Sequence, residues 1–211
     1  STTGKPDSTG SVGTAVEGAI KEVSELLDKL VKAVKTAEGA SSGTDAIGEV
    51  VDNAAKVADK ASVTGIAKGI KEIVEAAGGS EKLKVAAATG ENNKEAGKLF
   101  GKAGADANGD SEAASKAAGA VSAVSGEQIL SAIVKAADAA DQEGEKPGDA
   151  KNPIAAAIGK GNENGADFGD GMKKDDQIAA AIALRGMAKD GKFAVKSGGE
   201  KGKAEGAIKG A

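Results

Sequence analysis

Hydrophobic residues recur at helical spacing along much of the chain, most clearly near its N-terminus. Between residues 14 and 38 they follow one another at gaps of three and four, as in Val16, Ile20 and Val23. This spacing predicts a long amphipathic helix. Thr14 and Glu17 have the spacing of a capping box, which would begin the helix at Thr14. Residues 1–13 are polar and rich in glycine, so we expect a flexible N-terminal segment there.

Shorter helices are predicted along the rest of the chain, separated by turns rich in glycine, asparagine and aspartate. Two starts have specific signals: Ser125 and Gln128 form a second capping box, and Asn152 precedes Pro153 at a first helical position. Ser62 is expected to cap another helix. The expected helices are 46–60, 62–77, 81–88, 93–103, 111–124, 125–137, a short one from 153, 172–189 and 204–211. No segment has a convincing period-two pattern, so no strand is expected.

One predicted helix differs from the others because residues 178–184 are apolar on every side. Such a helix belongs in the middle of a bundle and not on its surface. Asp175 and Asp176 favour its positive N-terminal end. The fold class predicted is therefore all-α, an irregular multi-helix bundle. It would have Gly/Asn/Asp/Lys-rich surface loops, a buried central helix near residues 176–189, and one domain over residues 14–211.

Composition limits the core and the chemistry. Only 37 of the 211 residues are isoleucine, valine, leucine or phenylalanine, so the core should be thin, with alanine at close helix contacts. The chain has no cysteine, histidine, tryptophan or tyrosine. Disulfides, thiol nucleophiles, Cys/His zinc sites and the commonest acid–base side chain are excluded. We expect no enzyme, no catalytic residue, no cofactor and no small-molecule substrate.

The net charge and the hydropathy of the chain argue against two further classes of binding partner. The net charge of −4 and the lack of stacking aromatics argue against nucleic acid. The longest apolar run, residues 178–184, is far shorter than the ~20 residues that span a bilayer. No signal peptide begins the chain, so any membrane anchor is expected to lie outside it.

Three motifs admit a chemical and a structural interpretation. Asp106, Asn108 and Asp110 have the first half of a calcium-loop spacing, but Ser111 and Ala117 stand where an EF-hand needs glycine and glutamate, which favours an acidic turn. Glycines 159, 161 and 165 lack the strand and the Gly-Lys-Ser/Thr ending of a phosphate loop. No metal site is expected at either place.

Arg185 is the third such feature. It is the only arginine and lies in the most apolar helix. A structural role, either paired with a buried carboxylate or reaching to the surface, is favoured over a binding role.

The pentapeptide Glu-Gly-Ala-Ile-Lys occurs twice, at residues 17–21 and 205–209. Two copies that bracket a domain, with no array between them, are not typical of a solenoid. They indicate the edges of a replaceable block, marked by Glu17 and Lys21 at one end and by Glu205 and Lys209 at the other.

Residues 172–196 resemble an invariant segment of the variable large protein family of Borrelia surface antigens, and the resemblance extends to residues 17–42 and over essentially the whole chain. It implies that this segment is a structural helix and an epitope. The residues carried over are Met172, Lys173, Lys174, Asp175, Asp176, Gln177, Ile178, Ile182, Leu184, Arg185, Met187, Lys189 and Phe193.

The resemblance also implies a function. Members are lipoproteins exposed on the bacterial outer membrane and anchored by an N-terminal lipidated cysteine, which would lie upstream of this chain. A central cassette, here about residues 17–209, is replaced by gene conversion, so that host antibodies meet changed loops; the family's terminal helices would be truncated. The loops expected to be variable and exposed are 45–53, 92–110, 141–149, 159–171 and 197–202.

Two alternatives come from other classes. A stress-protective protein of the late-embryogenesis type would share the composition but lack a cooperative thermal melt. An adhesin would bind a host ligand, although no aromatic or arginine-rich anchor is evident. Self-association is left open.

Overall fold

The computed structural model describes residues 6–40, 48–52, 57–101, 108–139, 142–161 and 163–211. These residues are mostly helical, which confirms the all-α class. The helices are α1 (Pro6–Ala40), α2 (Lys60–Ala76), α3 (Ser111–Ser122), α4 (Gly126–Ala137), α5 (Pro153–Ile158), α6 (Asp175–Met187) and α7 (Gly198–Lys209). Two 3-10 helices, η1 (Ser80–Leu83) and η2 (Lys94–Phe100), and two short strands, β1 (Val50–Val51) and β2 (Phe193–Ala194), complete the described elements.

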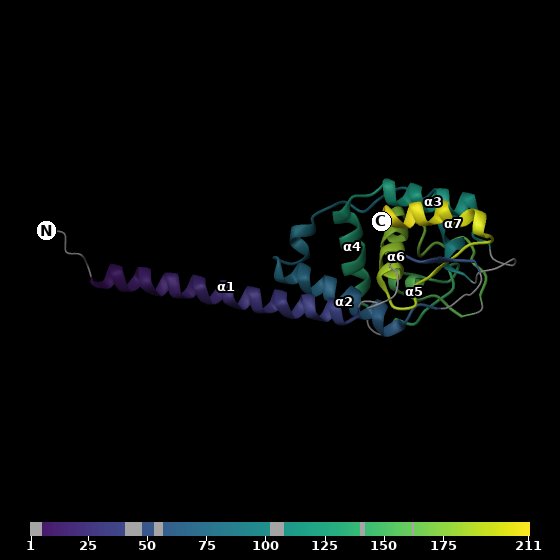
Figure 1. The fold of residues 1–211 in the computed structure, drawn as a ribbon. Coiled ribbons are helices and arrows are strands. Elements are labelled where there is room, and N and C mark those ends of the chain that lie inside the picture. Colours follow the sequence, from purple (N-terminus) through teal and green to yellow (C-terminus); the bar gives the residue numbers. More distant parts are fainter. Residues whose placement is uncertain (1–5, 41–47, 53–56, 102–107, 140–141, 162) are drawn as a thin grey trace.

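Helix α1 forms an arm that projects far beyond the rest of the molecule (Figure 1). It begins at Pro6 and not at Thr14, so the prediction of a flexible segment over residues 1–13 is wrong for residues 6–13. Proline suits a first helical position because the amide hydrogen that it lacks would have no intrahelical partner there. Thr14 and Glu17 therefore lie inside the helix and do not begin it.

Helix α2 packs closely against the C-terminal part of the arm through glycine. A Cβ atom added to Gly69 would lie 2.7 Å from the Cβ of Ala37, and one added to Gly65 would lie 2.5 Å from the Cβ of Ala40. The cap of α2 is Asp59, whose carboxylate accepts from the Ser62 amide at 2.7 Å, so Ser62 is not the cap. Instead the Ser62 hydroxyl donates to the Ala40 carbonyl and accepts from the Lys189 amide at 2.9 Å. Ser62 thus ties α1, α2 and the segment after α6 together.

The helix predicted over residues 46–60 is wrong in its described part. Gly48 has φ +69°, which breaks a helix, and Val50–Val51 pairs in parallel with Phe193–Ala194. The amides of Phe193 and Val195 donate to the carbonyls of Glu49 and Val51 at 2.9 and 3.0 Å. Adjacent β-branched residues suit this extended, buried position, and the expectation of no strand fails here for that reason.

Two further helices are shorter than expected. The segment 81–88 is 3-10 only as far as Leu83, and 93–103 is the 3-10 helix η2, whose described part ends at Phe100. Between these two segments the backbone forms a hydrogen bond with a side chain of α6: the Ala88 amide donates to the Asp176 carboxylate at 3.2 Å. Tertiary hydrogen bonds have replaced the helical ones, against the local preference of an alanine-rich segment.

The predicted helix starts in the middle of the chain are confirmed. In the capping box of α4, the Ser125 amide donates to Gln128 at 2.9 Å and the Gln128 amide donates to the Ser125 hydroxyl at 3.2 Å. Asn152 caps α5, with Pro153 at its first position. Asp110 caps α3 by accepting from the Ala113 amide at 2.9 Å.

The last helix, α7, begins at Gly198, so the loop expected over residues 197–202 is helical from 198. Ala204, Ala207 and Ile208 are buried, and α7 packs on α3. This burial stabilises a helix whose first turn is glycine-rich, and Glu200 adds an acid at its positive end.

Helix α6 lies in the middle of the body, in contact with α2, α3, α4, α5, α7 and η2 (Figure 1). Ten of its thirteen residues are buried, which confirms the predicted central helix. The core on one side of it contains Phe100, Phe168 and Phe193, with Phe100 5.1 and 5.5 Å from the other two ring centroids. The core on the other side is built from aliphatic residues of α2, α4 and α5.

Within the part of the chain that the structure describes, no single helix has the length and hydropathy to cross a membrane. Helices α3 and α4 meet those limits only when joined, and they are bent by 99° at their junction.

The α1–α2 contact leads to a stability prediction. Gly69→Ala should lower the free energy of unfolding by about 1–3 kcal/mol, because the added methyl group meets the backbone of Ala37. The control is Gly206→Ala in α7, where an added Cβ meets nothing within 4 Å; it should raise stability by roughly 0.5–1 kcal/mol. Chemical denaturation followed by circular dichroism measures both. Equal effects of the two changes would contradict the close contact.

Candidate functional site

The side chains of the predicted invariant segment lie mainly inside the molecule. Lys174 and Lys189 are exposed, and Lys173, Gln177 and Met187 are half-buried. The buried members are Met172, Asp175, Asp176, Ile178, Ile182, Leu184, Arg185 and Phe193. The segment is therefore the centre of the core and presents little surface of its own.

At the N-terminal end of α6, two buried carboxylates hold the segment of residues 88–93. Asp175 accepts from the side-chain amide of Asn93 at 2.8 Å, and its own amide donates to the Gly90 carbonyl at 3.0 Å. Asp176 accepts from the Ala88 amide and, at 2.9 Å, from the Gln177 amide. A Cβ on Gly90 would lie 2.2 Å from an Asp175 oxygen, so only glycine fits there. The carboxylates thus serve the helix end, as predicted, and also fix a neighbouring segment.

At the other end, Arg185 is 1% exposed and lies against aromatic rings. Its Nε donates to the Lys192 carbonyl at 2.8 Å, and its Nη1 donates to the carbonyls of Ala157 and Ile158 at 3.0 and 3.4 Å. The guanidinium carbon is 5.5 Å from the Phe100 ring centroid and 6.0 Å from that of Phe193. The predicted structural role fits this geometry, but the alternative in which the side chain reaches the surface is wrong.

Burial lowers the pKa of Arg185 to about 10, which leaves the side chain charged at neutral pH. A buried charge is tolerated when it is well hydrogen-bonded, and here backbone carbonyls from two other segments accept hydrogen bonds from the guanidinium. Arg185 therefore joins the end of α5 and the turn before β2 to α6.

The two copies of the pentapeptide lie in different surroundings. Glu17 and Lys21 are exposed on the arm, whereas α7, which carries the second copy, lies in the body (Figure 1). In that copy Glu205 is half-buried, Lys209 is exposed and Ile208 is buried. The structure does not bring the copies together, so their identity has no shared structural role.

The loops form a packed layer at the end of the body that faces away from the arm (Figure 1). Their backbones touch through glycine: a Cβ on Gly165 would lie 2.1 Å from the Lys98 carbonyl oxygen, and one on Gly169 would lie 2.3 Å from that of Gly148. Asn108 donates to the Gly165 carbonyl at 2.6 Å. Gly165 and Phe168 are buried, so the expectation that loop 159–171 is exposed holds only for its outer residues, such as Lys160 and Asp170.

Sequence reasoning missed this glycine layer. The signal for it lies in the 32 glycines of the chain, which mark backbone contacts as well as loops. Asn93 and Ser62 were missed as well, because their partners are distant in sequence.

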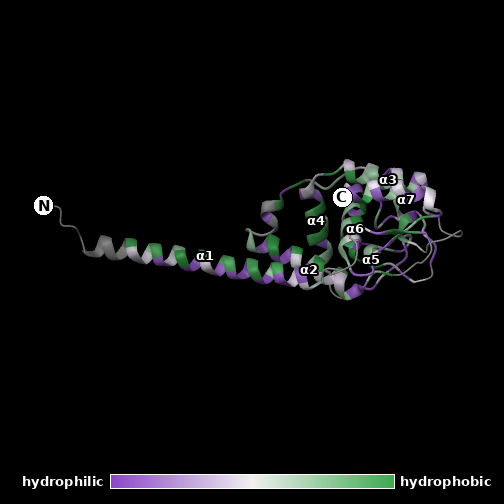
Figure 2. Ribbon diagram, viewed as in Figure 1, coloured by the Kyte–Doolittle hydropathy of each residue, from purple (hydrophilic) through white to green (hydrophobic). Residues whose placement is uncertain are grey.

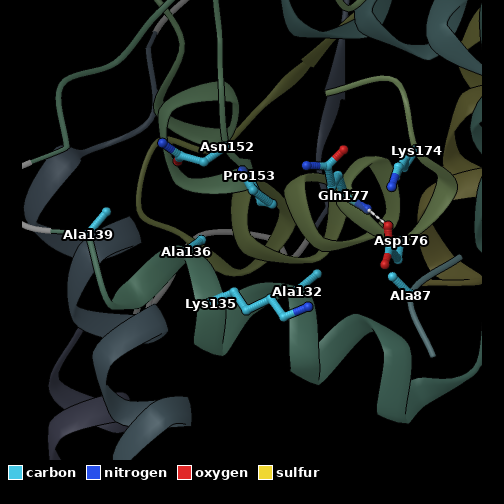
Figure 3. Close-up of a pocket in the computed structure, with 10 residues that line it drawn as sticks. All are labelled: Ala87, Ala132, Lys135, Ala136, Ala139, Asn152, Pro153, Lys174, Asp176 and Gln177. Atoms are coloured by element: carbon cyan, nitrogen blue, oxygen red, sulfur yellow. Dashed lines mark hydrogen bonds between the residues drawn. The ribbon is translucent and has the colours of Figure 1, made fainter. Parts of the chain in front are cut away.

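A hollow of about 250 Å³ opens beside the N-terminal end of α6. Figure 3 shows Lys135 of α4 on one wall, Lys174 and Gln177 on the other, and alanine side chains between them. The Asp176 carboxylate at its edge already accepts two amide hydrogens. The described residues that line this hollow include no constellation of catalytic groups.

The calcium-like motif is used structurally where it is described. The Asn108 side chain donates a hydrogen bond to the Gly165 carbonyl, and Asp110 caps α3. Both contacts are those expected of an acidic turn. Asp106 lies outside the described residues.

Comparisons with known proteins agree with this architecture. Residues 2–211 match the family model described as Borrelia lipoprotein. The chain belongs to the Borrelia lipoprotein family. It is 41% identical to variable large protein 17 of Borrelia hermsii over 188 residues, which are 86% of this chain and 52% of that protein. It is 39% identical to variable large protein 4 of the same organism over 185 residues, 84% of this chain and 51% of that protein.

A solved member of the family has the same fold. The Lyme disease variable surface antigen VlsE of Borrelia burgdorferi is 86% identical, with a TM-score of 0.88 over 94% of this chain and 68% of that one. The chain spans about half the length of the curated relatives it matches. These findings confirm the resemblance drawn from residues 172–196.

The Arg185 geometry predicts a large effect of a conservative change. Arg185→Lys should lower the free energy of unfolding by about 2–4 kcal/mol, because an ammonium cannot reach both sets of carbonyls and remains buried. Lys189→Arg, an exchange at an exposed cation close in sequence, is the control and should change stability by less than about 0.5 kcal/mol. Urea unfolding measures both. A tolerated Arg185→Lys would show that the carbonyl contacts contribute little.

The glycine layer predicts a contrast between two loop glycines. Gly165→Ala should cost about 1–3 kcal/mol, because its methyl group meets a carbonyl oxygen. Gly161→Ala should be neutral or slightly stabilising, because the nearest atom to its Cβ, in Val57, is 3.9 Å away. Thermal melts of both variants test the contrast, and similar melting temperatures would refute it.

Proposed function

We propose that this chain is the surface-exposed part of a Borrelia lipoprotein that undergoes antigenic variation. The observation that carries the proposal is the 86% identity to a variable surface antigen over 94% of the chain. Variation of exposed loops on a fixed helical frame would let the protein change what host antibodies bind while it keeps its fold.

The architecture supports this division of roles. The frame depends on α6, whose carboxylates and arginine fix segments on both sides of it. The loop layer lies at the opposite end from the arm, and its outer side chains contribute little burial (Figure 1). Substitution of those side chains has a small cost, because surface changes away from packed features usually alter stability by less than about 0.5 kcal/mol.

The finer assignments belong to the same proposal. Residues 17–209 correspond to the replaceable cassette, with the pentapeptide copies at its edges, and residues 172–193, which include α6, form a fixed segment with an epitope. The protein is lipid-anchored to the outer membrane through sequence outside these residues, and its partners are host antibodies. The lipoprotein description of the family and the name of the matched variable surface antigen support these assignments.

The alternative functions are not favoured. A late-embryogenesis-type protein and an adhesin both lack support from the comparisons, whose matches are named as variable large proteins and as a variable surface antigen. None of these names is that of an enzyme.

Antibody absorption tests the proposal. Serum raised against the native chain is absorbed with a variant altered at three exposed loop residues, Lys151→Glu, Asn164→Lys and Asp170→Lys. A large share of the antibodies should remain unabsorbed, while the melting temperature stays unchanged.

The matched control alters three exposed lysines of α7, Lys201, Lys203 and Lys209, to glutamate. This variant should absorb nearly all the antibodies that the native chain absorbs. If the α7 variant leaves as much antibody as the loop variant, the loop layer is not the dominant antigenic surface and the proposal fails.

A further inference from the structure

Two asparagines of the loop layer, Asn108 and Asn164, are followed by glycine, and no other asparagine of the chain is. Both side chains are exposed, and that of Asn108 donates to the Gly165 carbonyl at 2.6 Å. An asparagine before glycine is the sequence most prone to spontaneous loss of its side-chain amide, because glycine has no Cβ to obstruct attack by its own backbone nitrogen. Both positions are therefore open to a slow chemical change.

Packing requires the glycine at both positions. A Cβ added to Gly109 would lie 2.2 Å from the Ala194 carbonyl oxygen, and one added to Gly165 would lie 2.1 Å from the Lys98 carbonyl oxygen. A side chain after either asparagine would slow the reaction, but it does not fit there. The reactive sequence is thus a consequence of how closely the loop backbones approach one another.

The two asparagines differ in how they are held. The reaction brings the side-chain carbon Cγ onto the backbone nitrogen of the next residue, so the side chain has to turn first. Asn108 is held by its hydrogen bond to Gly165, and the Gly109 carbonyl accepts from the Lys196 amide at 2.7 Å. Among the described residues, none forms a hydrogen bond with the Asn164 side chain or with the Gly165 amide that would attack it. The geometry therefore restrains Asn108 and leaves Asn164 free to turn.

We propose that Asn164 is a site of spontaneous deamidation in the folded protein and that Asn108 is protected from it. The Gly165 nitrogen attacks Cγ of Asn164 and closes a succinimide ring. The bond from Cγ to Nδ2 breaks, and ammonia leaves with the proton of the Gly165 amide. One water molecule then opens the ring. Cleavage between Cγ and the ring nitrogen leaves aspartate, and cleavage between the main-chain carbonyl carbon and that nitrogen leaves isoaspartate.

The two products differ in their effect on the loop layer. Each adds one negative charge at an exposed position, but isoaspartate also lengthens the main chain by one carbon beside Gly165. A Cβ on Gly101 would already lie 1.8 Å from the Gly165 nitrogen, so the extra carbon does not fit and the two segments have to separate. Aspartate keeps the main chain as it is and changes only the charge.

This chemistry has a consequence that rests on the proposed function. If antibodies bind the loop layer, the surface they meet changes with the age of each molecule as well as with the gene that encodes it. The chemical step itself does not depend on antibodies.

Ageing of the 211-residue chain in neutral buffer, followed by trypsin digestion and mass spectrometry, tests the proposal. Asn164 lies in the tryptic peptide of residues 161–173 and Asn108 in that of residues 103–116, so each reaction changes the mass of a different peptide. Asn164 should react about fivefold faster than Asn108, which is the rate factor of one ordinary hydrogen bond that has to break first. In urea the difference should disappear, because no folded contact then restrains Asn108.

Two controls accompany the measurement. Asn162 is in the same peptide as Asn164 but precedes glutamate, whose side chain hinders attack, so fragment masses should show it unchanged. Asn164→Gln should give no acidic product at that position, because the larger ring that glutamine would have to close forms far more slowly. This variant should keep the native melting temperature, since the side chain is exposed.

Two results would overturn the proposal. Equal rates at Asn164 and Asn108 in the folded chain would mean that the hydrogen bond to Gly165 gives no protection. Reaction of Asn164 in urea but not in the folded chain would mean that the packing of Gly165 blocks the attack. Neither result bears on the antibody absorption described above, so the two proposals fail separately.

Discussion

The scarcity of large side chains governs how this protein holds together. With few isoleucine, leucine, valine and phenylalanine residues to fill space, the chain brings backbones close enough to touch at many of its contacts, and alanine or glycine stands at those places. Helix α6 shows part of this, since three consecutive alanines, Ala179 to Ala181, are fully buried beside its larger side chains. Closely packed backbones gain favourable dispersion energy even though the side chains between them are small. The same closeness leaves no room for an added methyl group at sites such as Gly69 and Gly90.

The same scarcity explains why polar groups appear at both ends of α6. Asp175 and Asp176 bind residues 88–93, and Arg185 binds carbonyls from α5 and from the turn before β2. Hydrogen bonds to charged groups contribute about 1.5–3 kcal/mol each, which is considerable in a thin core. They also have direction, so they fix the positions of segments that alanine contacts alone would leave free to slide.

Local signals in the sequence predicted the elements that local physics controls. The capping box at Ser125, the Asn152–Pro153 start and the burial of α6 each depend on residues a few positions apart. The missed elements depend on distant partners. Residues 84–88 contain three consecutive alanines but bond to Asp176 instead of forming a helix, and Val50–Val51 pairs with a strand more than 140 residues later. The hydrogen bonds from Arg185 to backbone carbonyls and the two hydrogen bonds of the Ser62 hydroxyl could not be predicted for the same reason.

The contact between loop backbones has a consequence for recognition at that end of the molecule. An antibody footprint covers about 800 Å², which is more surface than one short loop offers, so it spans several segments of the layer. Since Gly148 and Gly169 touch, as do Lys98 and Gly165, a change of shape in one segment shifts its neighbour within the same footprint. The number of distinct surfaces available to the protein is therefore set by combinations of segments and grows faster than the number of loops that change.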